Sequence, residues 1–413
     1  MEAKTVRIKV DRVTPRLAYT CGIVFDLILG RKSELVTEGE CELAYVAERP
    51  AEAPVFVPCH GLLLETGIRP DFPFPTPLHH LPPINEFDFL AWAFFHLSLY
   101  ADYYQQQPEA YRKQVQSVDA PEIWVEDVAF HISDALGWER PSTAFDYEVT
   151  IDVDHPWKHR LKPLVVMAGG LVKDFLKGNK EGVRERWQAV MKGNDPFDID
   201  ELIAEMCPAE KTTFFYLVDG SHPRDSRFSI VQTPYAQRVR QLHAAGFGTA
   251  LHPSYESSDS PDLFARQKHL LEKAIDSPVS KSRQHYLRFQ IPHTFRDLLH
   301  AGIREEYSLC HNHKCGARTR IARSYHWYDL EKDQVTELLL TPAQVMDRTL
   351  QQYLKLEPEA ALVETRKMID RVRGVNGKFV LILHNETFSE SGEWLGWRSI
   401  IETMLAELKG HAG

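Results

Sequence analysis

From residue 147 onward, short apolar runs alternate with longer segments of helical periodicity. The runs typical of strands are YEVTIDVD, TTFFYLVD, FGTALHP, HYLRFQIP, TELLLTP and KFVLILHN, which begin at residues 147, 212, 247, 285, 336 and 378. Between them, apolar residues recur at helical spacing in LFARQKHLLEKAI, FRDLLHAGI, AQVMDRTLQQYLKL and AALVETRKMIDRVRGV. This alternation predicts a parallel α/β sheet, and seven or so units over about 265 residues fit a closed or nearly closed barrel.

The first 145 residues follow a less regular pattern. They include a proline-dense stretch, IRPDFPFPTPLHHLPPINEFD, which is typical of an irregular loop, and FDFLAWAFFHLSLYADYY, which is apolar on most faces and predicts a buried helix. The segment PSTAFDYEV, from Pro141, predicts a linker that runs into a strand. We therefore expect an α/β support domain over residues 1–145 and a barrel over residues 146–413.

Composition narrows the class of protein. The chain has 413 residues, 43% of them hydrophobic and 26% charged, which is ordinary for a globular protein. Its net charge of -10 argues against a nucleic-acid partner, because affinity for phosphates comes mostly from clustered Lys and Arg. The N-terminus lacks the apolar core of a signal peptide, and the longest apolar stretch, LVVMAGGLV from Leu164, is too short to span a membrane. We expect a cytoplasmic protein with no membrane span, whose six cysteines are thiols.

Polar side chains gather where the predicted strands end. They are Asp152 and Asp154, then His252, then Arg283, His285 and Tyr286, and finally His384 with Asn385. Side chains two apart in a strand share a face, so Asp152 should lie beside Asp154, and Arg283 beside His285. Since chemistry in such barrels takes place at the carboxyl ends of the strands, these residues have the composition of a mononuclear metal hydrolase site.

The same stretches carry a resemblance to a known family. The segments AWAFFHLSLYADYY, IDVDHPW, LHPSYES, SRQHYLRF, YHWYDL, MDRTL and LILHNE occur in the order seen in polysaccharide deacetylases, the NodB-homology group of carbohydrate esterase family 4. The chain resembles a bacterial subgroup in which a distorted seven-stranded barrel follows an uncharacterised N-terminal domain. The resemblance implies a metal-dependent hydrolase that removes an acyl group, N-acetyl first, from a sugar of a glycan or glycan precursor.

The resemblance also implies a ligand set. Asp152 would be the catalytic base and Asp154 a metal ligand, although the assignment could be reversed. His252 matches the first histidine of the family's second motif, and the second histidine of that motif is replaced by Glu256. His285 stands where the family has a proline, so Asp154, His252 and His285 are the expected ligands, with Glu256 in reserve. The ion is expected to be one divalent metal, with zinc first and iron, cobalt, nickel and manganese also suited.

The remaining catalytic roles come from the same comparison. Arg283 would pair with the base, the backbone N–H of Tyr286 would stabilise the oxyanion, and His384 would be the general acid. Arg318 keeps an arginine of the family's loop, and the candidates for contacts with a carbohydrate substrate are Arg318, Asp347, Trp394 and Trp397. Core packing of the two tryptophans, and a helix-start role for Asp347, are equally open.

Two alternatives stay open. The stretch CHNHKC, Cys310 to Cys315, could hold a second metal, but its close spacing favours a loop over the rim of the site. The glutamate at 256 and the altered loop also leave room for a non-catalytic glycan-binding or scaffold protein. A carbon–nitrogen hydrolase acting on a non-sugar amide is a third possibility.

Overall fold

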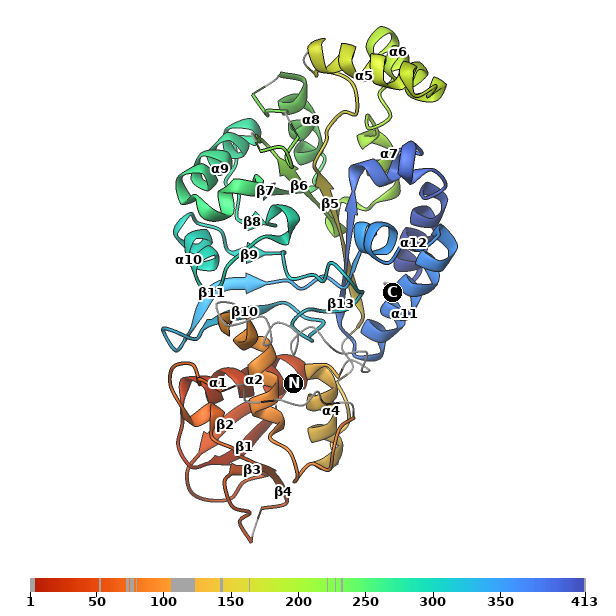
Figure 1. Ribbon diagram of the computed structural model, residues 1–413. Helices are drawn as coiled ribbons and strands as arrows, with labels where there is room; N and C mark the ends of the chain where they lie inside the picture. The colour runs from red at the N-terminus through yellow and green to blue at the C-terminus, as the bar shows by residue number, and fades with distance from the viewer. Residues whose placement is uncertain are drawn as a thin grey trace.

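The computed structural model describes residues 4–51, 53–71, 74, 78, 80–104, 123–141, 144–162, 164–220, 222–226, 228–231 and 233–411. Two sheets organise the chain: a small one near the N-terminus and a large one in the remainder (Figure 1). No helix in the described part of the chain is both long and apolar enough to cross a bilayer.

The small sheet is parallel, in the order β2-β1-β3-β4. Its strands are β1 (Thr5–Val10), β2 (Lys32–Val36), β3 (Leu43–Val46) and β4 (Val55–Pro58). The helices packed with it are α1 (Pro15–Cys21), continued by a π-helix (Gly22–Ile28), α2 (Phe89–Leu97) and α4 (Val125–Ala135). Within α2 every residue except His96 is buried, which confirms the buried helix expected there.

The large sheet has the order β10-β11-β9-β8-β7-β6-β5-β13-β12. Its strands are β5 (Asp146–Val153), β6 (Thr212–Leu217), β7 (Gly248–His252), β8 (Lys281–Ser282), β9 (Glu305–Glu306), β10 (Tyr325–Asp329), β11 (Gln334–Leu340), β12 (Val345–Met346) and β13 (Lys378–His384). Neighbouring strands are parallel except β10 and β11. The predicted α/β class and parallel sheet are thus confirmed, while no ladder among the described strands closes β12 onto β10.

Helices flank this sheet on both sides. On one side lie α8 (Thr233–Ala244), α9 (Pro261–Ile275) and α10 (His293–His300), and on the other α7 (Asp200–Met206), α11 (Pro358–Gly374) and α12 (Arg398–His411) (Figure 1). The helices predicted at residues 263, 295 and 360 correspond to α9, α10 and α11. Two further helices, α5 (Leu164–Leu176) and α6 (Lys180–Lys192), form a hairpin beyond the end of β5.

Two local predictions are wrong. The strand expected over residues 285–292 is absent, because β8 ends at Ser282 and a 3-10 turn follows at His285–Leu287, with Tyr286 at φ 57°. The helix expected from residue 343 is replaced by β12 and a π-helix at Thr349–Tyr353. In both cases the apolar spacing reflects burial by tertiary contacts, which periodicity alone cannot tell from a regular element.

Strand β5 has two chemically different faces. One face places Tyr147, Val149, Ile151 and Val153 in the main hydrophobic core. The alternate positions are polar and buried: Glu148, Thr150 and Asp152, followed by Asp154 just past the strand. A strand whose second face is polar throughout needs partners for each group, and this requirement positions the site described below.

The N-terminal part packs against the antiparallel β10–β11 hairpin. Arg16 of α1 is fully buried and donates from Nε to Asp333 Oδ1 over 2.8 Å. Tyr19 donates to the His326 carbonyl over 2.8 Å, and its ring lies 4.9 Å from that of Tyr328. Because one hydrophobic cluster is continuous across both sheets, the domain division at residue 145 stays a prediction.

We predict that Arg16→Ala lowers the free energy of unfolding by about 3 kcal/mol, because it removes one partner of a buried ion pair. The loss should not be larger, since Asp333 keeps 18% exposure. Arg7→Ala is the matched control: its partner Glu34 is 3.8 Å away and both side chains are exposed, so a change within about 1 kcal/mol is expected. Urea unfolding measures both, and equal losses would contradict the role given to Arg16.

Candidate active site

Three side chains from different strand ends converge on one point. Asp154 lies just past β5, His252 ends β7, and His285 lies in the turn after β8. Asp154 Oδ1 is 3.3 Å from His252 Nε2 and 3.7 Å from His285 Nε2. One ligand atom from each residue lies within 4.8 Å of the others, and all three residues are buried. In the described part of the chain, this is the one group of His, Cys, Asp and Glu side chains with such an arrangement.

The spacing fits a small divalent ion. Nitrogen and oxygen ligands lie about 2.0–2.2 Å from zinc, so tetrahedral ligands stand roughly 3.3–3.6 Å apart. Asp154 Oδ1 is buried and has no hydrogen-bond partner among the described residues, which is costly for a carboxylate oxygen without a cation. These two observations show that the residues present suit a metal.

The outer nitrogens of both histidines are occupied. His252 Nδ1 lies 2.6 Å from the Arg283 carbonyl, and His285 Nδ1 lies 2.8 Å from Asp225 Oδ1. A carbonyl or carboxylate oxygen only accepts, so each Nδ1 carries a proton and each Nε2 is the ring nitrogen that is turned toward Asp154. This is the orientation that metal-binding histidines require.

Asp225 was not singled out in the sequence. It lies in the segment after β6, a strand whose end supplied no candidate residue. Asp225 Oδ1 also accepts from the backbone N–H of Tyr255 over 3.0 Å. Gly220 makes room for it, because a Cβ at that position would stand 2.4 Å from the Asp225 Cβ. A carboxylate shortly after a strand was the only available signal, and sequence spacing could not show that it reaches His285.

A buried ion pair lies beside the ligands. Arg283 Nη1 donates to Asp152 Oδ1 over 2.5 Å and Nη2 donates to Thr150 Oγ1 over 2.8 Å. The other Asp152 oxygen, Oδ2, is 4.0 Å from His252 Nε2. Asp152 therefore holds the guanidinium with one oxygen and turns the second toward the ligand cluster, as expected for a base that is not itself a ligand.

His384 closes the site from the other side. Its Nε2 is 3.8 Å from Asp154 Oδ2, and its Nδ1 is 2.7 Å from Asp347 Oδ1. Asp347 is fully buried and also accepts from the His384 backbone N–H over 2.6 Å and from the Thr387 hydroxyl. The expectation that Asp347 contacts substrate at the rim is therefore wrong, because its carboxylate is already occupied in orienting His384.

The charges of these groups are coupled. Burial would raise the pKa of Asp154, but His285, His252 and His384 outweigh it and hold this pKa well below its usual value. Burial would lower the pKa of His285, but the carboxylates of Asp154 and Asp225 raise it to about 9. Burial would also lower the pKa of His384, and the Asp347 carboxylate raises it instead. Without a metal, these shifts favour the protonated forms of His285 and His384.

Several expected residues lie elsewhere or act otherwise. Glu256 is exposed and outside the ligand group, so the reserve ligand is not brought to the site. Arg318 pairs with Asp102 and lies over the Phe289 ring at 4.8 Å, which ties it to the N-terminal part. Tyr286 has a half-exposed side chain beside His285, with ring centroids 4.6 Å apart.

The two tryptophans pack in the core. Trp394 and Trp397 are 2% and 3% exposed and contact each other edge to face, with ring centroids 5.5 Å apart. They do not lie on one helix, since Trp394 ends a 3-10 turn (Gly392–Trp394) and α12 begins at Arg398. Sugar stacking on these rings is therefore not supported, because rings this buried offer no free face.

The CHNHKC segment does not gather into a second centre. The Cys310 thiol packs with Ala343, Met346, Val380 and Ile382, and burial raises its pKa to about 12. None of the six cysteines forms a disulfide. The part of the chain that the structure describes holds no second group of candidate ligands here, so the segment is a loop.

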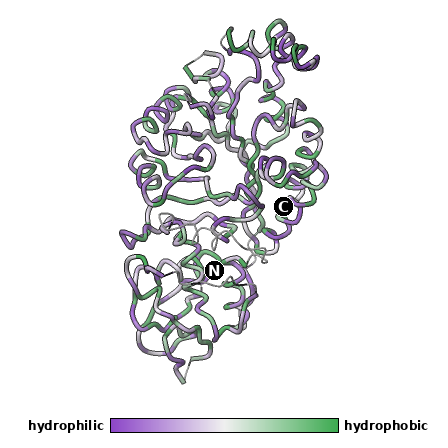
Figure 2. The backbone as a smooth tube through the Cα atoms, viewed as in Figure 1, coloured by the Kyte–Doolittle hydropathy of each residue, from purple (hydrophilic) through white to green (hydrophobic). Residues whose placement is uncertain are grey.

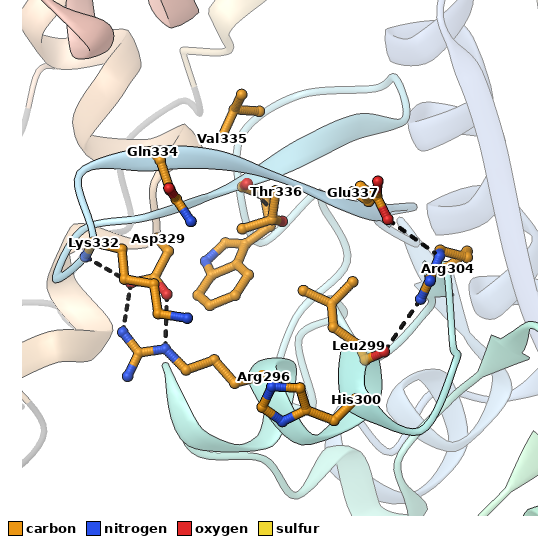
Figure 3. A pocket seen from close by; sticks show the side chains of 11 residues that line it. Arg296, Leu299, His300, Arg304, Asp329, Lys332, Gln334, Val335, Thr336 and Glu337 are labelled. Carbon is orange, nitrogen blue, oxygen red and sulfur yellow. Dashed lines mark hydrogen bonds and ion pairs between the residues drawn. The ribbon is translucent and has the colours of Figure 1, made fainter.

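A pocket of about 430 Å³ lies away from this site, between α10 and the β10–β11 hairpin (Figure 3). Arg296 and Arg304 line it, but Arg296 donates to both oxygens of Asp329, and Arg304 lies 3.5 Å from Glu337. Because both guanidinium groups are already paired, the pocket offers no strong anchor for a charged ligand.

Comparison with known proteins finds similar solved structures but no similar sequence. No family model matches it, and no curated protein matches it in sequence. Among solved structures it is similar to a Mycobacterium smegmatis protein assigned as a polysaccharide deacetylase, with 16% identity, a TM-score of 0.42, and coverage of 65% of this chain and 85% of the other. It is also similar to an allantoinase, with 10% identity and a TM-score of 0.41. That match covers 65% of this chain and 85% of the allantoinase. A third similar structure is a CE4 family pseudoenzyme from Bacillus anthracis, with 11% identity and a TM-score of 0.32. That match covers 75% of this chain and 76% of the pseudoenzyme.

We predict that the purified protein binds one divalent ion and that Asp154→Asn or His285→Gln removes it, because each substitution leaves two of three ligands. Glu256→Gln is the control, since this exposed residue lies outside the group, and it should leave the metal content unchanged. Elemental analysis after dialysis measures the stoichiometry. Equal metal content in Asp154→Asn and Glu256→Gln would contradict the assignment.

Metal affinity should rise with pH. Binding must displace the proton that His285 carries below its pKa of about 9, so metal affinity should increase by up to about tenfold per pH unit as the pH rises toward 9. Asp225→Asn removes one carboxylate that raises the pKa of His285. In this variant the metal affinity should therefore stop increasing at a lower pH than in the unaltered protein. Titrations in chelator-buffered metal measure the slope, and an affinity independent of pH would refute it.

Proposed function

We propose that the chain is a metal-dependent hydrolase that removes an acyl group, N-acetyl first, from a sugar of a glycan or glycan precursor. The observation that carries this proposal is the placement of two different proton-handling groups on either side of one candidate ion site. Asp152 lies beside His252 and is anchored by Arg283, while His384 lies beside Asp154 and is anchored by Asp347.

The metal would be held by Asp154, His252 and His285. When bound, it would supply a Lewis acid that polarises the acyl carbonyl and makes a water molecule more acidic. Two neutral imidazoles and one carboxylate leave such an ion a net positive charge and open positions for substrate.

Asp152 is suited to accept a proton. Its Oδ1 is engaged by Arg283, which leaves Oδ2 for the water that attacks the carbonyl. The position of the guanidinium is fixed, because it also donates to Thr150 and, over 3.2 Å, to the Tyr307 carbonyl. The carboxylate is thereby fixed in one orientation, which general-base catalysis needs.

His384 is suited to donate a proton. Asp347 accepts from Nδ1 and stabilises the charged ring, so the Nε2 proton faces the site. An amine departing from the collapsing tetrahedral intermediate needs that proton to become a stable leaving group. The backbone N–H of Tyr286, next to His285 in a left-handed turn, is our proposed donor to the oxyanion.

The substrate class rests on the family resemblance of the motifs rather than on a sugar-binding surface. The groups described act on the acyl carbonyl and its amine, and an amide outside a sugar presents the same atoms. A non-catalytic protein would have no need for a fixed base opposite a fixed acid, and this arrangement favours the enzyme over a scaffold.

We predict that Asp152→Asn keeps the bound metal but lowers acetate release from N-acetylglucosamine oligomers roughly a hundred- to ten-thousand-fold, since the base is lost and the ligands are not. His384→Gln should give a loss of similar size, also with metal retained. Asp154→Asn should lose both metal and activity. Coupled acetate detection with elemental analysis of each variant separates these cases.

Trp397→Phe is a matched control, because it alters a buried aromatic residue that we place outside the chemistry, and it should keep activity if the fold is kept. Full activity in Asp152→Asn would refute the catalytic assignment. A wild-type protein that holds metal and releases acyl groups only from amides outside sugars would favour the carbon–nitrogen hydrolase, and one that holds metal without turnover would favour the scaffold.

A further inference from the structure

The α5–α6 hairpin stands apart from the rest of the molecule. It extends beyond the end of β5, and its two helices pack mainly against each other (Figure 1). Arg186 Nε donates to Asp174 Oδ2 over 2.6 Å between the helices, and Gly170 allows this approach, because a Cβ there would stand 2.5 Å from the guanidinium. Asn179 caps α6 by accepting from the Gly182 N–H over 3.0 Å. The hairpin is therefore a formed element rather than a loose loop.

Its outer surface is unusually apolar. Of the 18 exposed large hydrophobic side chains in the described part of the chain, ten lie between residues 161 and 192. They are Leu161, Val165, Val166, Leu171, Val172, Phe175, Leu176, Trp187, Val190 and Met191. Scattered exposed hydrophobic side chains are normal, whereas such a concentration on one projecting element is typical of a binding surface. Figure 2 colours many positions of this hairpin green, for hydrophobic residues.

The apolar residues of α5 form a stripe on the side away from α6. Val165, Val172 and Leu176 are seven and eleven residues apart, which places them on one face of a helix, and Phe175 borders them. Asp174 and Gly170 face Arg186 of α6 on the opposite side. A helix usually turns its apolar stripe inward, whereas α5 turns its stripe outward.

Positive charge accompanies this surface. Residues 158–192 contain nine Lys and Arg and three Asp and Glu, although the whole chain has a net charge of -10. The exposed cations on the two helices and their connection are Lys173, Lys177, Lys180, Arg184 and Lys192, against one exposed anion, Glu181. Protein interfaces are depleted of lysine, whereas apolar faces bordered by lysine and arginine are typical of helices that lie on anionic membranes.

We propose that the α5–α6 hairpin docks on the surface of a lipid bilayer that contains anionic lipids. Phe175, Leu176 and Trp187 enter the boundary of the acyl chains, and the lysines contact the headgroups. Each helix has 13 residues and is about 20 Å long, shorter than the roughly 30 Å of a hydrocarbon core, so the hairpin lies on the membrane and does not span it.

The hairpin is tied to the rim of the candidate active site. Lys158, four residues after Asp154, lies 2.6 Å from Glu185 of α6, and Glu185 accepts from Ser391, seven residues after His384, over 2.6 Å. Docking therefore holds the carboxyl ends of β5 and β13 at a fixed position relative to the membrane surface. The docking itself does not depend on the proposed catalysis.

The test uses the full-length protein and two kinds of vesicle, phosphatidylcholine alone and phosphatidylcholine with phosphatidylglycerol. Sedimentation should show binding to the anionic vesicles, weaker binding in high salt, and little binding to phosphatidylcholine alone. Trp187 is 53% exposed and is the one exposed residue among the eight tryptophans, so its fluorescence should shift to shorter wavelength on binding.

Two variants probe the two contributions separately. Phe175→Ser with Leu176→Ser removes apolar contacts, and Lys173→Glu with Lys177→Glu reverses charge; each pair should weaken binding about tenfold or more. Val335→Ser with Val363→Ser is the matched control, because these exposed valines lie on β11 and α11, and it should bind as the unaltered chain does. Circular dichroism checks that each variant is folded.

No sedimentation with anionic vesicles would overturn the proposal, and so would equal binding by all three variants. A dimer in solution that Phe175→Ser with Leu176→Ser dissociates, without vesicle binding by the unaltered chain, would show that a second copy covers the hairpin and would also overturn it.

Discussion

The guanidinium of Arg283 is the group on which the site depends. It is fully buried, and a buried cation is tolerated only when its donors are matched. Asp152, Thr150 and the Tyr307 carbonyl accept from it, and the Phe215 ring lies 4.2 Å away. These partners come from β5, β6 and the segment after β9, so one charge fixes the separation of several strands. The carbonyl of the same residue accepts from His252, which links the structural ion pair to the ligand set.

The three histidines of the site are distinguished by what holds their outer nitrogen. His252 is held by a neutral carbonyl, His285 by Asp225 and His384 by Asp347. A carboxylate stabilises a charged ring, and a carbonyl does so only weakly. In the proposed function, His384 would therefore keep a proton to donate, and Asp225 would make His285 a more basic ligand. The difference in role thus arises from partners outside the cluster, in agreement with the general behaviour of residues that support metal ligands.

Much of this arrangement could be read from alternation along the chain. The period of two on β5 correctly placed Asp152 and Asp154 on one polar face, and the ends of β7 and β13 supplied His252 and His384. His285 reaches the ligand group, but from a turn and not from the strand that was expected. Asp225, the occupied state of Asp347 and the burial of Trp394 depend on contacts between distant segments, which no local pattern encodes. The sequence shows the apolar residues of α5 only as an apolar run. Which side of the helix they face depends on how α6 packs against it.

The order of the strands has a consequence for how the protein is made. β13 pairs with β5 in a register that sets His384 opposite Asp152, although 232 positions separate them. During synthesis the chain emerges from its N-terminus, so β5 lies at the edge of an incomplete sheet until β13 has also left the ribosome. A product that ended before β13 would contain all three candidate metal ligands and would lack His384. Catalysis of the kind proposed would therefore have to wait until β13 pairs with β5, however early the candidate metal ligands are made.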